Sequence, residues 1–93
     1  MKLDKEHLKI AEVHWVDSLS GSSWTLTEDY EGNNAIDCFT IGILINESES
    51  AVTLAQNVGF SPDQFCNTIT IPKCAVKSIK TREYNVKRKA YYK

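Results

Sequence analysis

A strict alternation of side chains in residues 36–46 constrains this chain more than any other feature. Residues of one parity are Phe39, Ile41, Ile43 and Ile45, and residues of the other are Cys38, Thr40, Gly42 and Leu44. Successive side chains of a β-strand point to opposite faces, so both faces of this strand are largely apolar. Such a strand is typical of the centre of a sheet or of an interface. Gly42 in its middle predicts a bend or the close approach of another backbone.

The rest of the chain also follows a period of two. The predicted strands are residues 8–17, 36–46, 51–58, 65–71 and 75–81. A connection rich in Ser, Gly, Asn and acidic residues covers 17–35, with room for one helical turn at 27–30. Pro72 has no N–H to donate and ends the fourth strand, and residues 72–75 have the length of one 3-10 turn. We therefore expect an all-β fold, a small five-stranded antiparallel barrel with a long loop after strand 1 and a tight 3-10 turn before strand 5, because closure removes sheet edges.

The 93 residues are expected to form one barrel domain over 1–81, followed by a basic, aromatic C-terminal tail over 82–93. A formal net charge of −1 hides an asymmetry between two parts of the chain. Residues 1–72 hold eleven acidic residues against three lysines, which gives −8; residues 73–93 hold eight basic residues against one glutamate, which gives +7. Basic residues interleaved with aromatics suit nucleic acid, but an acidic barrel would repel a long polyanion. The electrostatics therefore favour contact of the tail with an acidic protein surface, such as that of an adjacent subunit. The alternative, and the leading one for residues 87–93, is a frayed, solubilising tail.

The first residues and the cysteines indicate a cytoplasmic protein. No apolar run approaches the roughly 20 residues that cross a bilayer, and the charged start has no apolar segment of a secretory signal. Cys38, Cys66 and Cys74 are an odd number of cysteines, which favours reduced thiols, and their apolar surroundings predict that all three are buried. Their spacing lacks the close pairs of structural zinc sites. No metal and no other cofactor is predicted.

The residues that could support catalysis do not form a recognised arrangement. Four serines lie close to His14 in the sequence, namely Ser18, Ser20, Ser22 and Ser23. A nucleophilic serine needs a base within hydrogen-bond reach. The sequence also lacks the G-x-S-x-G elbow that exposes a catalytic serine. The acidic residues of the long connection carry no sign of two opposed environments, as paired acid and base carboxylates require. A hydrolase built on these groups is the weakest hypothesis, and the chain is predicted not to be an enzyme.

The connection after the first strand holds the best candidate site for a small ligand. Asp17, Ser18, Ser20 and Ser22 belong to a Ser/Gly-rich run whose hydroxyl and N–H groups can surround an anion. The run lacks the G-K-[ST] ending of a phosphate-binding loop. Trp24 follows at once, and its indole either stacks a base or folds back over the end of the barrel. Trp15, by contrast, continues the apolar face of the first strand and is predicted to lie in the core.

Four further polar residues complete the predicted ligand-binding set. Gln56 and Asn57 are amides near the end of the third strand, where they can read a base edge or a ribose, bond a neighbouring backbone, or face water. Lys73 in the tight turn and Arg82 at the start of the tail offer positive charge to a phosphate. An exposed lysine without a ligand is the alternative for Lys73.

Several short segments resemble a group of small bacteriophage and prophage proteins. The segments are residues 15–18 (W-V-D-S), 40–44 (T-I-G-I-L), 54–56 (L-A-Q) and 69–73 (I-T-I-P-K). The resemblance covers roughly residues 11–80 and implies a small barrel of the Sm or Src-homology type. Some small phage proteins of comparable size act against host defence by sequestering nucleotide-derived immune signals. The resemblance implies such a role in the cytoplasm of an infected bacterium.

The leading hypothesis is a non-enzymatic phage or prophage binding protein, a homo-oligomeric anti-defence factor that sequesters a small anionic, nucleotide-derived signal. Oligomerisation is predicted from the two-sided apolar strand and from the charge asymmetry. The alternative is a small-barrel adaptor that binds a host protein or nucleic acid through its basic C-terminal tail. No membrane partner is predicted.

Overall fold

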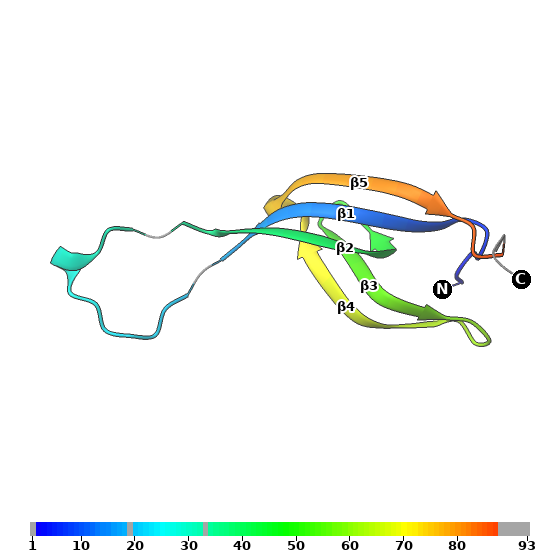
Figure 1. The fold of residues 1–93 in the computed structure, drawn as a ribbon, viewed down its shortest axis with the longest axis horizontal. Helices are drawn as coiled ribbons and strands as arrows, with labels where there is room; N and C mark the ends of the chain where they lie inside the picture. The colour runs from blue at the N-terminus through cyan, green and yellow to red at the C-terminus, as the bar shows by residue number, and fades with distance from the viewer. Residues whose placement is uncertain (1, 19, 33, 88–93) are drawn as a thin grey trace, which may run out of the picture.

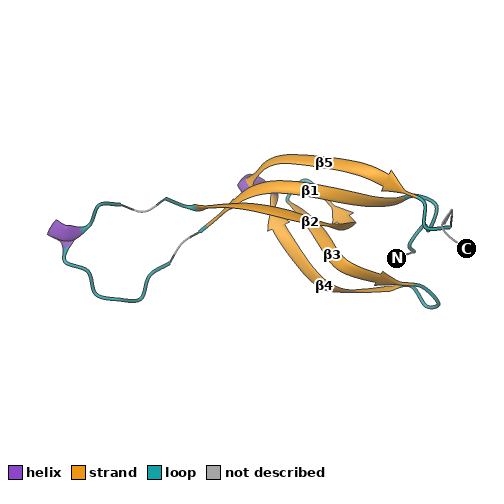
Figure 2. Cartoon of the chain, in the orientation of Figure 1, coloured by secondary structure: helices purple, strands orange, loops and turns teal. Residues whose placement is uncertain are grey.

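The computed structural model describes residues 2–18, 20–32 and 34–87, and these form one sheet of five antiparallel strands (Figures 1 and 2). The strands are β1 (Leu8–Asp17), β2 (Ile36–Glu47), β3 (Ala51–Gly59), β4 (Gln64–Pro72) and β5 (Val76–Tyr84). Two 3-10 turns, η1 (Thr27–Asp29) and η2 (Lys73–Ala75), fall where the sequence predicted single turns. The all-β class and the order of the elements are confirmed. The largest boundary change is in β5, which continues to Tyr84 and takes in the first residues of the predicted tail.

The strand order is β4-β3-β2-β1-β5, so each of the first three strands pairs with the next and β5 returns to the other side of β1. The sheet is not closed, because β4 and β5 stand at its two opposite edges. β2 pairs with β1 from Ile36 to Ile43 but with β3 only from Ile43 to Glu47. Beyond that point the β3–β4 hairpin diverges from the layer formed by β5, β1 and β2 (Figure 1). A closed barrel, as expected from the sequence, is therefore not observed in the single chain.

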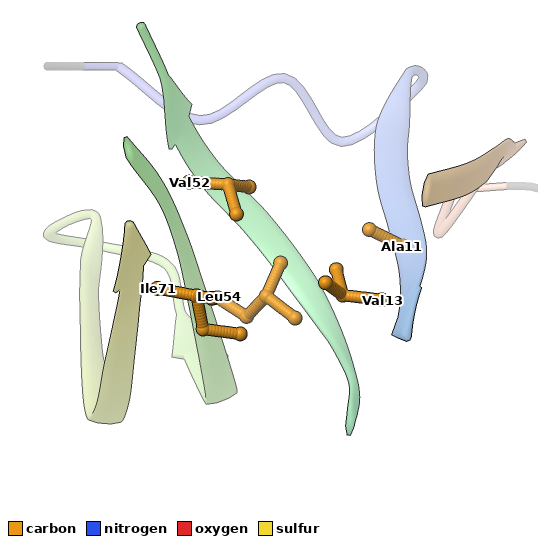
Figure 3. Packing of buried hydrophobic residues seen from close by; sticks show 5 residues of the cluster. All are labelled: Ala11, Val13, Val52, Leu54 and Ile71. Carbon is orange, nitrogen blue, oxygen red and sulfur yellow. The ribbon is translucent and has the colours of Figure 1, made fainter. Parts of the chain in front are cut away.

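The core lies on the inner face of the bent sheet, where β1 faces the β3–β4 hairpin. Its fully buried members are Ala11, Val13, Val52, Leu54 and Ile71 (Figure 3). Around them pack Trp15, Leu44, Val76 and Ile79, which are partly buried. Trp15 thus lies against the core as predicted, and its indole N–H donates a hydrogen bond to the Thr40 hydroxyl at 3.0 Å. Side chains from three strands bury one another without a helix covering the sheet.

Gly42 marks the close approach of a second backbone, as its position in the sequence predicted. A Cβ atom at this residue would lie 3.0 Å from the carbonyl oxygen of Ala55 and 3.0 Å from the Cβ of Leu54. Real Cβ atoms are rarely that close to backbone, so any larger residue would push β3 away from β2.

The prediction of three buried cysteines was wrong. Cys66 and Cys74 are exposed, and Cys38 is half-buried. Cys66 lies on an edge strand with parity opposite to that of the buried Ile71, so it points away from the core. Cys74 lies in the short turn η2, which presents no buried residue. Apolar neighbours in the sequence did not reveal which face each thiol would occupy.

Candidate binding surfaces

A long arm, residues 20–32, carries most of the predicted ligand-binding loop. It projects from the sheet between β1 and β2, and η1 lies at its far end (Figure 1). Every residue of the arm is exposed, and the Trp24 side chain is as exposed as in an extended peptide, at 103%. Trp24 therefore does not cover the end of the sheet in this chain, and its indole faces are open. At the base of the arm, a carboxylate oxygen of Asp17 accepts the backbone N–H of Ser18 at 2.8 Å.

A hollow opens between β2 and β3 where the two strands part. Its volume is about 250 Å³, and its lining consists of Thr40, Ile41, Gly42, Leu54, Ala55, Gln56, Asn67 and Ile69. Gln56 and Asn67 occupy the position in the β3–β4 ladder between the pairs Ala55–Thr68 and Asn57–Cys66. Two amides and the Thr40 hydroxyl give this hollow both donors and acceptors, which suits the polar edge of a small ligand.

Sequence reasoning found Gln56 but missed Asn67. A signal was present, because Asn67 has the parity of Phe65, Ile69 and Ile71 and so places an amide among apolar side chains. Its backbone φ of 58° lies in the left-handed region, which asparagine tolerates better than most residues. A polar residue among the apolar residues of one strand face is therefore the pattern that indicates a residue of such a hollow.

Gln56 and Asn57 do not act together, although they were predicted as a pair. Adjacent residues of a strand point to opposite faces. Gln56 lines the hollow, whereas the Asn57 amide N–H donates to the sulfur of Cys66 at 3.6 Å on the other face. The two amides of the predicted ligand-binding set therefore lie on different faces of β3.

Lys73 and Arg82 are also separated. The ammonium of Lys73 lies 3.0 Å from a carboxylate oxygen of Glu47, and its backbone N–H donates to Ser50 at 2.8 Å. These bonds tie η2 to the turn between β2 and β3, so the charge of Lys73 has a partner within the chain. Arg82 is exposed on β5, beside a shallow hollow of about 250 Å³ lined by Ile10, Glu12, Lys80 and Thr81.

The nine predicted ligand-binding residues thus lie on four parts of the molecule. Asp17, Ser18, Ser20, Ser22 and Trp24 belong to the end of β1 and the arm; Gln56 and Asn57 to β3; Lys73 to η2; and Arg82 to β5. Because the arm points away from the sheet, one chain does not bring its hydroxyls and indole to the amides and cations.

Both histidines bond to carboxylates. His14 Nε2 lies 2.7 Å from Asp37 Oδ1, and Lys77 Nζ lies 3.6 Å from the same oxygen. The hydrogen bond from His14, with the nearby positive charges, holds the pKa of Asp37 below its usual value. His7 Nδ1 lies 3.1 Å from Glu83 Oε1, and that hydrogen bond raises the pKa of His7. Within residues 2–18, 20–32 and 34–87, no three His, Cys, Asp or Glu side chains are grouped as a metal site would require.

A further hollow, of about 460 Å³, separates the N-terminal segment from the β3–β4 turn. It is lined by Lys2, Leu3, Asp4, Lys5, Glu6, Phe60, Ser61, Asp63 and Lys87. Three contacts cross or border it: Asp63 accepts the N–H of Leu3 at 2.8 Å, Lys5 lies 4.8 Å from the centre of the Phe60 ring, and Glu6 lies 3.6 Å from Lys87. The first two tie the N-terminal segment to the β3–β4 turn, and the third ties it to the residue Lys87 after β5.

No protein-family model matches this chain, and neither a curated protein nor a solved structure matches it. The resemblance to phage proteins therefore stays an expectation drawn from short segments. In the part of the chain that the structure describes, no helix has the length and apolar character of a membrane span.

Proposed function

We propose that this chain is a non-enzymatic binding protein that works as a homo-oligomer and holds a small anionic, nucleotide-derived ligand. The observation that carries the proposal is the open indole of Trp24 on an arm rich in serine. Aromatic faces stack nucleobases, and hydroxyl and N–H groups bond phosphate oxygens. In one chain these groups stand apart from the amides of the β2–β3 hollow and from Arg82. A complete site would therefore form between the arm of one copy and the sheet of another.

The bonding of the histidines supports a role without catalysis. A serine nucleophile needs a base within about 3 Å of its hydroxyl. His14 and His7 instead bond to Asp37 and Glu83, and the serines of the arm lie on an exposed segment away from both. The histidine–carboxylate pairs act as structural bonds across the sheet in this proposal.

The wider biological role and the closed barrel belong to the same proposal. Sequestration of a nucleotide signal by a phage or prophage protein, as an anti-defence factor in the bacterial cytoplasm, is what the resemblance of the short segments implies. A closed barrel would require β4 and β5, the two edge strands, to pair with each other. Pairing of these edges with another copy is the other way to remove them.

A thermal-shift screen against cyclic nucleotides, cyclic dinucleotides and ADP-ribose derivatives tests the ligand class. A ligand that binds only the folded protein raises its melting temperature, and a concentration of 100 times the dissociation constant adds about 2.7 kcal/mol. We expect at least one of these compounds to stabilise the protein and Trp24→Ala to abolish the shift. The proposal is rejected if none of them changes the melting temperature.

The adaptor hypothesis keeps one observation in its favour, which is the basic surface of β5 and the residues after it. The described start of the tail is not free, because Val86 N–H donates to Lys5 at 2.7 Å and Lys87 lies 3.6 Å from Glu6. Residues 88–93, which hold three more basic residues, lie outside the described part of the chain. A truncation after Lys87 leaves β5 intact, and under this hypothesis it abolishes partner binding in a pull-down.

A further inference from the structure

The arm combines exposed apolar side chains with negative charge. Trp24, Leu26 and Tyr30 are 103%, 64% and 58% exposed. The thirteen residues 20–32 also include three acidic residues, Glu28, Asp29 and Glu31, and contain no lysine, arginine or histidine. An exposed cluster of this kind, held on a projecting segment, is typical of a surface that is covered by a partner.

The shape of the chain indicates how much surface remains to be covered. Its radius of gyration is 18.2 Å, whereas a compact domain of this length has about 12 Å. Its accessible surface is 7369 Å², whereas a compact monomer of this mass has about 5,400 Å². The surplus of about 1,900 Å² in each chain, or about 3,800 Å² for two chains, is in the range that obligate homodimer interfaces bury.

A complementary surface lies on the face of β5, β1 and β2 that points away from the core; we call it the outer face. The strand register places Phe39 and Ile41 of β2 beside His14 and Glu12 of β1, and Lys80 of β5 beside Glu12. Phe39 and Ile41 are 62% and 59% exposed, which is unusual for large apolar residues of a strand. At these positions β2 pairs with β1 alone, because its pairing with β3 begins at Ile43.

Positive charge borders this apolar strip. Lys80 and Arg82 are exposed on the same side of β5, and Arg82 stands opposite Ile10. Glu12 is a carboxylate opposite Lys80. Asp37 has the parity of Phe39 and lies on the same face, but its carboxylate is already paired with His14 and Lys77. Lys80 and Arg82 therefore stand against the single carboxylate of Glu12. The outer face therefore has an apolar band on β2 and a basic edge on β5, while the arm has apolar side chains and carboxylates.

We propose that the arm of one copy docks on the outer face of a second copy of this chain. Leu26, Tyr30 and one face of the Trp24 indole cover Phe39 and Ile41, and the other face of the indole stays open for a base. The carboxylates of the arm approach Lys80 and Arg82. This inference rests on the assembly invoked in the proposed function and adds which surfaces form it; it does not depend on the class of ligand.

A second copy fits better than a foreign partner for two reasons. Arm and outer face occur in equal number on every chain, so one contact satisfies both the apolar and the charged surfaces. The contact also explains why a chain with a net charge of −1 keeps its acidic and basic residues apart, because opposite charges on separate patches guide copies to each other.

Light scattering after size-exclusion chromatography tests this with the full chain and without nucleotide. At micromolar concentration the wild-type protein is expected to have a mass of at least two chains, each of 10.5 kDa. Trp24→Ala with Tyr30→Ala is expected to raise the dissociation constant at least tenfold. Ser23→Ala with Thr25→Ala, on the same arm, is the matched control and should leave the mass unchanged. Circular dichroism checks that each variant keeps its β-sheet.

Charge reversal separates a direct contact from an indirect one. Lys80→Glu with Arg82→Glu, or Glu28→Lys with Asp29→Lys, should each dissociate the assembly, and the protein with all four changes should reassemble. The inference is overturned by a wild-type monomer at every concentration and salt, by an assembly that neither reversal weakens, or by a fourfold variant that stays dissociated. A foreign protein or nucleic acid bound at Lys80 and Arg82 of a monomer overturns it as well. A failed nucleotide screen with an intact assembly rejects the ligand alone.

Discussion

At Gly42 the backbone of β3 lies close to β2, and this residue gives the sharpest stability prediction. In Gly42→Ala the new Cβ would lie 3.0 Å from the backbone of Ala55, so β3 must shift. Overpacking of this kind costs typically about 1–3 kcal/mol of unfolding free energy. Gly21→Ala is the control, because no atom lies within 4 Å of the Cβ position there. Urea denaturation of both variants measures the difference, and equal stabilities would show that β2 and β3 are not this close.

The His7–Glu83 contact gives a prediction about pH. The hydrogen bond to Glu83 raises the pKa of His7 above its ordinary value of 6.5. Its stabilising effect is therefore complete below pH 6.5 and is lost as the pH rises through the higher pKa of the folded protein. An NMR titration of the His7 ring should show a midpoint above 6.5 that falls in Glu83→Gln. A midpoint unchanged by that substitution would mean that the contact is absent in solution.

At the scale of the strands, Ile71 and Ile69 test where the core lies. Both belong to β4 and share one parity, but Ile71 is fully buried whereas Ile69 is 36% exposed. Ile71→Ala should cost about 2–5 kcal/mol, as fully buried isoleucines do. Ile69→Ala should cost clearly less, because it borders the β2–β3 hollow. The denaturant midpoints of the two variants show which substitution costs more unfolding free energy. A larger cost for Ile69→Ala would mean that the core lies nearer to the β2–β3 hollow.

The strands and turns could be predicted because their signals are local. Alternating side chains marked β2, Pro72 marked the end of β4, and both 3-10 turns fell on the expected residues. Whether the sheet closes into a barrel could not be predicted from these local signals, because it depends on where β2 stops pairing with β3. The same divergence creates the hollow beside Gln56, so the sequence pointed to one of its two amides and missed Asn67.

In the molecule as a whole, the acidic and basic residues behind the charge asymmetry of the sequence lie on different surfaces. The arm contributes three of the negative charges, and β5 presents Lys80 and Arg82 on the outer face. The sequence predicted that the basic tail meets an acidic surface of an adjacent subunit, and this stays a prediction; the docking proposal uses Lys80 and Arg82 of β5 as the positive partner. Which face of β5 carries those residues follows only from its register with β1.

The most direct test of the account is zero-length cross-linking of mixed isotopes. Protein labelled with 15N and unlabelled protein are denatured together, refolded and treated with a carbodiimide, which joins a carboxylate to a lysine as an amide with loss of water. The account predicts peptides in which Glu28, Asp29 or Glu31 is joined to Lys80, with one partner labelled and the other not. If mass spectrometry finds Lys80 joined only to carboxylates of its own copy, the arm does not dock on a second chain.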